Sequence, residues 1–184
     1  MPSSVRAADA PPLATVVLHE PEIPNNTGTI GRTCVAMGAA LRLIEPIGFD
    51  VSAKACRRAG LDYWPRLDFG VEPSFAAYAS HPRAATAWAL STRATRPVFE
   101  ADFAAGDHIV FGSESRGLPA DVLGSFGGRA LCLPMLPGER SLNLANAVSM
   151  VLGEMVRQFA VSGAVRMEHG RISRAEDDRS AAHT

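Results

Sequence analysis

The stretch RSLNLANA, at residues 140–147, places several polar side chains between a turn and an apolar run. Pro137 and Gly138 precede it, and the longest apolar-periodic segment of the chain follows it. This pattern predicts a loop that becomes the N-terminus of a helix, where unpaired backbone N–H groups can bind a ligand. Asn143 would then help to orient a ligand, or it would serve only as the cap of the helix.

A second candidate segment reads FGSESRGLP, at residues 111–119, and carries Glu114 and Arg116. In one interpretation these two side chains form a surface ion pair with each other, which contributes little to stability. In the other, Glu114 lies near a cationic ligand or a ribose, and Arg116 faces a phosphate. Gly112 and Gly117 would allow the backbone to approach a flat ligand closely.

Arg32 is the third candidate, because it stands among small and apolar residues six positions after Asn26. A guanidinium group in such a segment needs an anionic partner. It could form a salt bridge to Glu20 or Glu22, or it could hold a phosphate or lower the pKa of a hydroxyl group. It cannot act as a literal general base, because guanidinium stays protonated in proteins.

Arg57, Arg58 and Tyr63 form the best local candidate for contact with RNA, since they combine two cations with a ring that can stack on a base. The two arginines would also suit the C-terminal end of a helix. Leu90 and Leu133, at expected strand ends, could line a ligand pocket or simply pack in the core.

Composition excludes several classes of protein. The chain has 184 residues, 47% of them apolar, which fits one globular domain, and its net charge of −1 gives no bulk attraction to nucleic acid. Three unpaired cysteines fit a reducing compartment, and no histidine has metal-ligand spacing, so we expect no metal. Neither a signal peptide nor a membrane span is present, and we expect a cytoplasmic protein.

Short apolar runs alternate with amphipathic segments along the chain. Asn25 and Asn26 are expected to cap the first helix, and Gly38 is expected to end it. Because the predicted strands read as apolar on both faces, we expect an α/β fold with a parallel sheet covered by helices. The expected strands are residues 15–19, 41–44, 86–90, 108–111 and 130–133, and the expected helices are residues 25–37, 52–59, 74–79, 120–126 and 142–159.

Three regions are expected along the chain: a flexible N-terminal segment at 1–13, a single domain at 14–160, and a flexible charged tail at 161–184.

Ligands of parallel sheets lie outside the carboxyl ends of the strands, in the loops that lead into helices. The loop after His19 reads PEIPNNTG, which is not a dinucleotide-binding glycine pattern, and no P-loop is present.

Three motifs together resemble those of the SPOUT class of RNA methyltransferases: Asn26 with Arg32, then FGSESRGLP, then LPM followed by RSLNLANAVS at residues 133–149. The further strings LHEPEIPNNTGTIGR and RRAGLDY are similar to the small, single-domain subgroup that methylates the ribose 2′-hydroxyl of the tRNA wobble nucleotide. The resemblance covers residues 16–158. The chain departs from that subgroup at residues 64–66 (WPR) and at Gly153.

The resemblance implies a deep trefoil knot in the C-terminal part of the sheet, S-adenosylmethionine bound in that knot, and a homodimer that completes the site across its interface. It places the catalytic role at Arg32 and Asn26 and RNA contact at Arg116. The cofactor-binding positions that it implies are Leu90, Gly112, Leu133 and Ser141, to which we add Glu114 and Asn143 as expected cofactor-binding residues. It implies that cytidine or a modified uridine at tRNA position 34 is the target; the alternatives are another tRNA position, ribosomal RNA, or a non-catalytic RNA- or cofactor-binding module.

Overall fold

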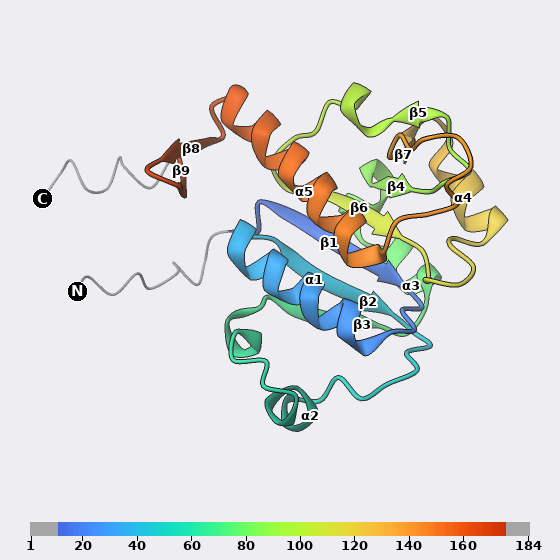
Figure 1. The fold of residues 1–184 in the computed structure, drawn as a ribbon, viewed down its shortest axis with the longest axis vertical. Helices are drawn as coiled ribbons and strands as arrows, with labels where there is room; N and C mark the ends of the chain where they lie inside the picture. The colour runs from blue at the N-terminus through green and yellow to red at the C-terminus, as the bar shows by residue number, and fades with distance from the viewer. Residues whose placement is uncertain (1–10, 176–184) are drawn as a thin grey trace, which may run out of the picture.

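Strand β1 (Ala14–His19) is buried along its whole length, because sheet neighbours flank it and helices cover both of its faces. It lies at the centre of a computed structural model that describes residues 11–175 of the chain. The sheet has seven strands in the order β3-β2-β1-β6-β4-β7-β5, and every neighbouring pair is parallel (Figure 1). The α/β fold with a parallel sheet is therefore confirmed.

The other strands of this sheet are β2 (Ala40–Ile44), β3 (Phe69–Glu72), β4 (Trp88–Leu90), β5 (Arg96–Pro97), β6 (Asp107–Phe111) and β7 (Ala130–Cys132). The α-helices are α1 (Pro24–Met37), α2 (Ala53–Arg58), α3 (Phe75–Ala79), α4 (Ala120–Phe126) and α5 (Leu144–Val161). Short 3-10 helices are η1 (Trp64–Arg66), η2 (Pro82–Thr86), η3 (Val98–Glu100) and η4 (Gly127–Arg129). None of the helices described is long and apolar enough to cross a bilayer.

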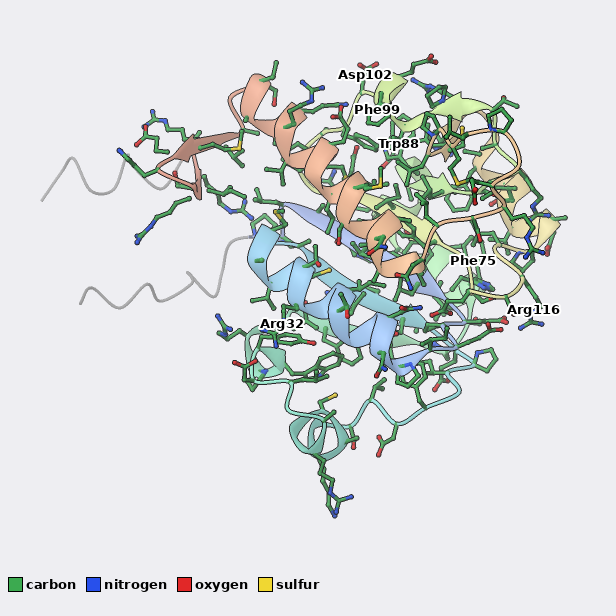
Figure 2. All side chains as sticks on the ribbon, viewed as in Figure 1. Arg32, Phe75, Trp88, Phe99, Asp102 and Arg116 are labelled. Carbon is green, nitrogen blue, oxygen red and sulfur yellow. The ribbon has the colours of Figure 1, made fainter. Side chains whose placement is uncertain are left out.

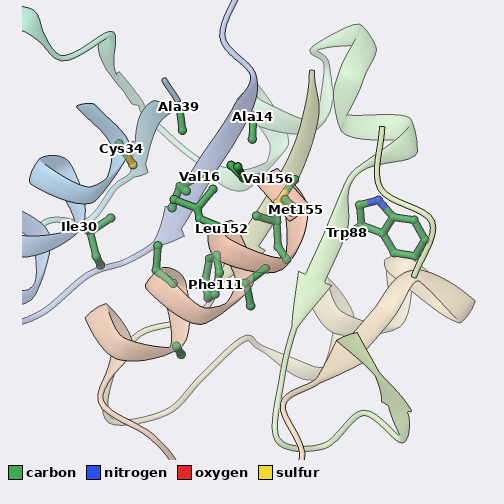
Figure 3. Close-up of a cluster of buried hydrophobic side chains, with 14 of the residues drawn as sticks. Ala14, Val16, Ile30, Cys34, Ala39, Trp88, Phe111, Leu152, Met155 and Val156 are labelled. Carbon is green, nitrogen blue, oxygen red and sulfur yellow. The ribbon is translucent and has the colours of Figure 1, made fainter. Parts of the chain in front are cut away.

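Two apolar clusters lie on the two faces of the sheet. Helices α1 and α5 cover one face, where Val16, Ile30 and Leu152 are almost fully buried (Figure 3). Helices α3 and α4 cover the other face, where Val17 packs with Tyr78 and other side chains of the second cluster. Adjacent residues of β1 thus pack into clusters on opposite faces of the sheet, because successive side chains of a strand point to opposite faces.

The start of α1 differs from the prediction that Asn25 and Asn26 cap it. Ile23 occupies the N-cap position without a side-chain hydrogen bond, and Pro24 is the first helical residue, a position that suits its fixed φ. The side chain of Asn26 is therefore available for other partners. Gly38 ends the helix in the left-handed conformation, with φ of 70°, as predicted.

Part of the predicted flexible tail is ordered. Strands β8 (Val165–Glu168) and β9 (Arg171–Arg174) form an antiparallel hairpin after α5, and Val165 is buried. The Arg174 guanidinium donates a hydrogen bond to the carbonyl of Pro11, which joins the hairpin to the start of the described chain. The sequence predicted no strands here, because a short hairpin beside a helix needs few apolar residues of its own. Residues 1–10 and 176–184 of the predicted flexible ends lie outside the described residues.

Candidate functional site

The carboxyl ends of β4, β6 and β7 and the start of α1 surround a cavity of about 680 Å³. Its position agrees with the rule that ligands of parallel sheets bind outside the carboxyl ends of the strands. Its volume falls within the usual range for small-molecule sites. We call it the strand-end cavity. Eight of the twelve predicted site residues line it: Asn26, Leu90, Gly112, Glu114, Arg116, Leu133, Ser141 and Asn143.

Asn143 both caps α5 and connects it to the rest of this cavity. Its side-chain oxygen accepts hydrogen bonds from the backbone N–H groups of Ala145 (2.9 Å) and Asn146 (3.2 Å). Its amide nitrogen donates to Oδ1 of Asn26 at 3.0 Å. The two roles that the sequence left open for Asn143 are therefore compatible, because capping uses the oxygen and leaves the amide group for α1.

Glu114 connects the same chain of hydrogen bonds to the loop after β6. Its carboxylate accepts from Nδ2 of Asn26 at 3.0 Å, and from the backbone N–H groups of Glu22 (2.8 Å) and Ile23 (3.3 Å). These N–H groups belong to the segment that begins α1. One carboxylate therefore fixes the loop, the helix start and the Asn26 side chain relative to one another.

Glu22, in the segment before α1, also bonds to the loop after β6. The carboxylate of Glu22 accepts from the hydroxyl of Ser115 at 2.7 Å and from its backbone N–H at 3.0 Å. These bonds, mainly the one from the hydroxyl, lower the pKa of Glu22 below its ordinary value. Sequence reasoning missed this pair, because nothing in the local pattern joins two residues 93 positions apart.

Arg116 does not pair with Glu114, so that interpretation was wrong. Its guanidinium lies 3.3 Å from a carboxylate oxygen of Glu20 and 3.9 Å from one of Glu22, while its side chain stays 71% exposed. These pairs contribute little to stability. An exposed guanidinium at the edge of the cavity remains accessible to a phosphate.

Gly112 is required by the loop itself. A Cβ atom there would lie 2.1 Å from the carbonyl carbon of Gly117 and 2.2 Å from the backbone nitrogen of Leu118. Gly117 has φ of 67°, which most side chains disfavour. The missing Cβ of Gly112 therefore allows the turn to fold onto strand β6, and Gly117 supplies its left-handed backbone. That both glycines also give room to a flat ligand stays a prediction.

Leu90 and Leu133 both line the strand-end cavity and both pack against the larger apolar cluster. The two interpretations of these leucines are thus not exclusive, because a strand-end side chain can contact the core on one side and the cavity on the other. Ser141 lies in the exposed loop before α5, on the same cavity.

Arg32 lies away from this cavity, although Asn26 on the same helix lines it. Arg32 borders a second groove, of about 470 Å³, between α1 and the segment around α2. Its guanidinium lies 3.2 Å from Oδ1 of Asp62 and 4.5 Å from the centre of the Tyr63 ring, and its side chain is 62% exposed. The predicted salt bridge to Glu20 or Glu22 is wrong, since Asp62 is the partner. Figure 2 shows Arg32 beside α1 and Arg116 at the right edge of the view, well away from it.

The predicted group of Arg57, Arg58 and Tyr63 is only partly available for contact with RNA. Tyr63 is 1% exposed, and its hydroxyl donates to the carbonyl of Gly28, so it holds α1 instead of offering a stacking face. The prediction failed because burial of a ring depends on the neighbouring helix. Arg58 is exposed at the end of α2, and the side chain of Arg57 lies outside the described part of the structure.

Two arginines on the strand-end cavity were not predicted. Arg93 follows β4, and its guanidinium donates to the carbonyl of Leu118; Arg140 lies in the loop before α5. The rule that strand-end loops carry the site could have identified Arg93. Among the residues 11–175, no group of three or more His, Cys, Asp or Glu side chains could hold a metal ion.

Comparison with known proteins places this geometry among RNA-modifying enzymes. The SpoU rRNA Methylase family matches residues 14–153. A tRNA (cytidine(34)-2'-O)-methyltransferase of Saccharophagus degradans is 43% identical over 149 residues, which cover 80% of this chain and 97% of that protein. A solved structure described as "Structural insights into the 2-OH methylation of C/U34 on tRNA" is 44% identical, with a TM-score of 0.74, and the match covers 83% of this chain and 99% of that one. The SpoU methyltransferase AviRb from Streptomyces viridochromogenes, in complex with the cofactor AdoMet, is 26% identical with a TM-score of 0.67, covering 81% and 58% of the two chains.

Proposed function

The chain belongs to the SpoU rRNA methylase family, and from that premise we propose that it transfers a methyl group from S-adenosylmethionine to the ribose 2′-hydroxyl of the tRNA wobble nucleotide, in the cytoplasm. The observation that carries the proposal is the strand-end cavity, where three sequence motifs that lie far apart in the chain meet through the bonds of Glu114, Asn26 and Asn143. Relatives that match over nearly their whole length are named for this reaction at cytidine 34.

The cavity has the groups that S-adenosylmethionine needs. Leu90 and Leu133 would supply apolar walls for the adenine, and Ser141 and the backbone of the loop after β6 would supply polar contacts. The carboxylate of Glu114, on the same wall, suits a ligand that carries a sulfonium charge. When bound, the cofactor supplies the electrophilic methyl group.

Arg32 is assigned to the acceptor nucleotide. Its guanidinium stays charged, so it would hold a phosphate of the RNA or stabilise the oxyanion that develops on the 2′-hydroxyl. Arg58, Arg57 and Arg116 would bind the RNA backbone around it. Arg32→Ala is expected to abolish methyl transfer and to leave cofactor affinity nearly unchanged, whereas Arg171→Ala, on the distant hairpin, should retain activity.

A homodimer would bring Arg32 to the cofactor. Within one chain Arg32 borders a different groove from the one that would hold S-adenosylmethionine, so the acceptor and the donor would meet only if the cofactor belongs to a second copy. We also propose that the loop between β7 and α5 is threaded as a trefoil knot, which would tie residues 133–143 around the cofactor.

Mixing two variants tests the shared site, at a concentration of S-adenosylmethionine too low to fill the Asn143→Ala site. In an equimolar mixture of Arg32→Ala and Asn143→Ala chains, half of the dimers are mixed, and each mixed dimer has one intact site, so activity should recover to about a quarter of wild type. The absence of any recovery after verified subunit exchange would place both residues in one chain's site and contradict the proposal.

The substrate is tested by methylating separate pools of tRNA and ribosomal RNA with labelled S-adenosylmethionine, followed by nucleoside mapping. We expect 2′-O-methylcytidine or its modified-uridine counterpart at tRNA position 34. Label in ribosomal RNA or at another tRNA position would reassign the target and keep the reaction. No transfer to any pool, with intact cofactor binding, would leave only a binding module.

A further inference from the structure

Three neighbouring strands place polar side chains under α3, near the amino ends of the strands and away from the strand-end cavity. In the sheet register, Thr15 of β1 lies beside His108 of β6, and Val17 of β1 lies beside Arg42 of β2. Side chains two positions apart on a strand share a face. Thr15, His108 and Arg42 therefore lie on the same face as Val17, which otherwise packs in an apolar cluster.

These polar side chains line a cavity of about 220 Å³, which we call the strand-start cavity. Thr15 is 3% exposed and His108 is 8% exposed, so both are deeply buried. The exposed residues His81 and Arg83, at the start of η2, stand at its mouth. Burying polar groups is unfavourable unless they gain partners, so this cluster needs an explanation.

His108 contacts Tyr78, whose hydroxyl lies 3.2 Å from Nδ1. Burial raises the pKa of Tyr78, and burial together with nearby cations lowers the pKa of His108 to about 4. At neutral pH the imidazole is therefore uncharged, and we assign the tautomer in which the phenol donates its proton to Nδ1. The imidazole proton must then be on Nε2, which makes Nε2 a donor.

Two donors in this cavity have no acceptor among the residues that the structure describes. Neither Nε2 of His108 nor the hydroxyl of Thr15 has a protein hydrogen-bond partner there, and both residues line the cavity. Both groups face the cavity, so a ligand that carries acceptor oxygens could pair with them there.

Two arginines and the carboxylate of Glu72 line the cavity, and the arginines are the groups that can attract an anion. After burial itself, the largest influences that lower the pKa of His108 are His81, Arg42 and Arg83, with Asp107 acting in the opposite direction. Arg42 is neutralised by Asp68 at 2.8 Å. Arg83 has no ion-pair partner among the described residues, so its charge is available at the mouth.

We propose that the strand-start cavity binds a phosphate group, with Thr15 and His108 donating to it at the floor and Arg83 neutralising it at the mouth. Glu72 also lines the cavity. Its carboxylate can accept a hydrogen bond only from an oxygen that carries a proton. Phosphate keeps such a proton near neutral pH and sulfate does not, so the site should prefer phosphate.

Calorimetric titration of the full chain with inorganic phosphate at pH 7, and separately with sulfate, tests the site. We expect one phosphate per chain, weaker binding of sulfate, and at least tenfold weaker phosphate binding in Thr15→Val and in Arg83→Gln. Thr15→Val keeps the shape of the buried side chain, and Arg83 is exposed, so both variants should fold. Arg171→Gln makes the same charge change outside the cavity and should bind like wild type.

Two results would overturn the proposal: no phosphate binding up to about 10 mM, or equal phosphate affinity in wild type, Thr15→Val and Arg83→Gln. Thermal melts of each variant confirm that any loss of binding does not come from unfolding. None of these measurements depends on methyl transfer, so they test the phosphate site independently of the proposed reaction.

The source of the phosphate is decided by tRNA kinetics. If free phosphate competes with tRNA, and Arg83→Gln raises the KM for tRNA, the group belongs to the RNA backbone. If the KM for tRNA is unchanged while phosphate binding is lost, the ligand is inorganic phosphate or a small phosphate monoester. Both outcomes require the phosphate affinity that the titration measures.

Discussion

Replacing Gly112 by alanine should disrupt the strand-end cavity through the backbone alone. The added Cβ would lie 2.1 Å from the carbonyl carbon of Gly117 and 2.2 Å from the nitrogen of Leu118, whereas real Cβ contacts essentially never fall below 3.0 Å. The turn must therefore open by about 0.9 Å, the difference between 3.0 and 2.1 Å. Both contacts are backbone atoms, and Leu118 is 1% exposed, so no flexible side chain can move aside.

The size of the effect follows from what this movement breaks. The backbone N–H of Gly117 donates to the carbonyl of Ser113 at 2.9 Å. An opening of about 0.9 Å would lengthen this N···O distance to about 3.8 Å, which is too long for a hydrogen bond. Overpacking of this kind costs about 1–3 kcal/mol, and we expect the upper end, about 3 kcal/mol of unfolding free energy. Glu114 lies on the same turn, so affinity for S-adenosylmethionine should fall at least tenfold, or about 1.4 kcal/mol.

Urea denaturation and calorimetric titration with S-adenosylmethionine measure the two effects separately. Gly124→Ala is the matched control, because a Cβ at Gly124 meets nothing within 4 Å and the residue lies inside α4. It should raise the unfolding free energy by up to about 1 kcal/mol and leave cofactor affinity unchanged. If Gly112→Ala were as stable as wild type and bound the cofactor equally well, the turn would not be packed as described and the reasoning would be refuted.

Three further predictions concern single side chains. The pKa of His108 is lowered from 6.5 to about 4, so as the pH falls the unfolded chain binds this proton before the folded chain does. The unfolding free energy is therefore unaffected by this group above pH 6.5 and falls by up to about 3 kcal/mol as the pH drops toward 4. Urea melts of His108→Gln at pH 7, 5 and 4 should show a smaller loss of unfolding free energy than wild type. Thr27 is 1% exposed and its hydroxyl has no hydrogen-bond partner among the described residues, so Thr27→Val should keep the unfolding free energy or raise it by about 1 kcal/mol. A clear loss of unfolding free energy in urea melts would show that the hydroxyl does form a hydrogen bond. Asn143→Ala removes the cap of α5 and the hydrogen bond to Asn26, so it should lower the unfolding free energy by about 1–2 kcal/mol in urea melts and weaken S-adenosylmethionine binding at least tenfold. Unchanged cofactor binding would show that Asn143 only caps the helix.

The sequence alone identified the elements whose signals are local. The strand at 15–19, the helix at 120–126 and the long last helix were predicted within two residues of their observed ends, because apolar period and turn residues act over a few positions. The order of the three motifs was also readable, and with it the family. Strands β3 and β5 were missed, since a short edge strand needs little apolar pattern of its own.

Only the tertiary structure decided which side chains meet. Asn26 and Glu114 are 88 positions apart, and Asn26 and Asn143 are 117 apart, so their bonds depend on strand register and helix rotation. The same rotation turns Arg32 to the opposite side of α1, over the ring of Tyr63. Likewise, His108 and Thr15 become neighbours only when β1 and β6 pair in register. The sequence gives the type of each side chain directly. Its partners depend on how distant segments pack together, which no short segment of the chain determines.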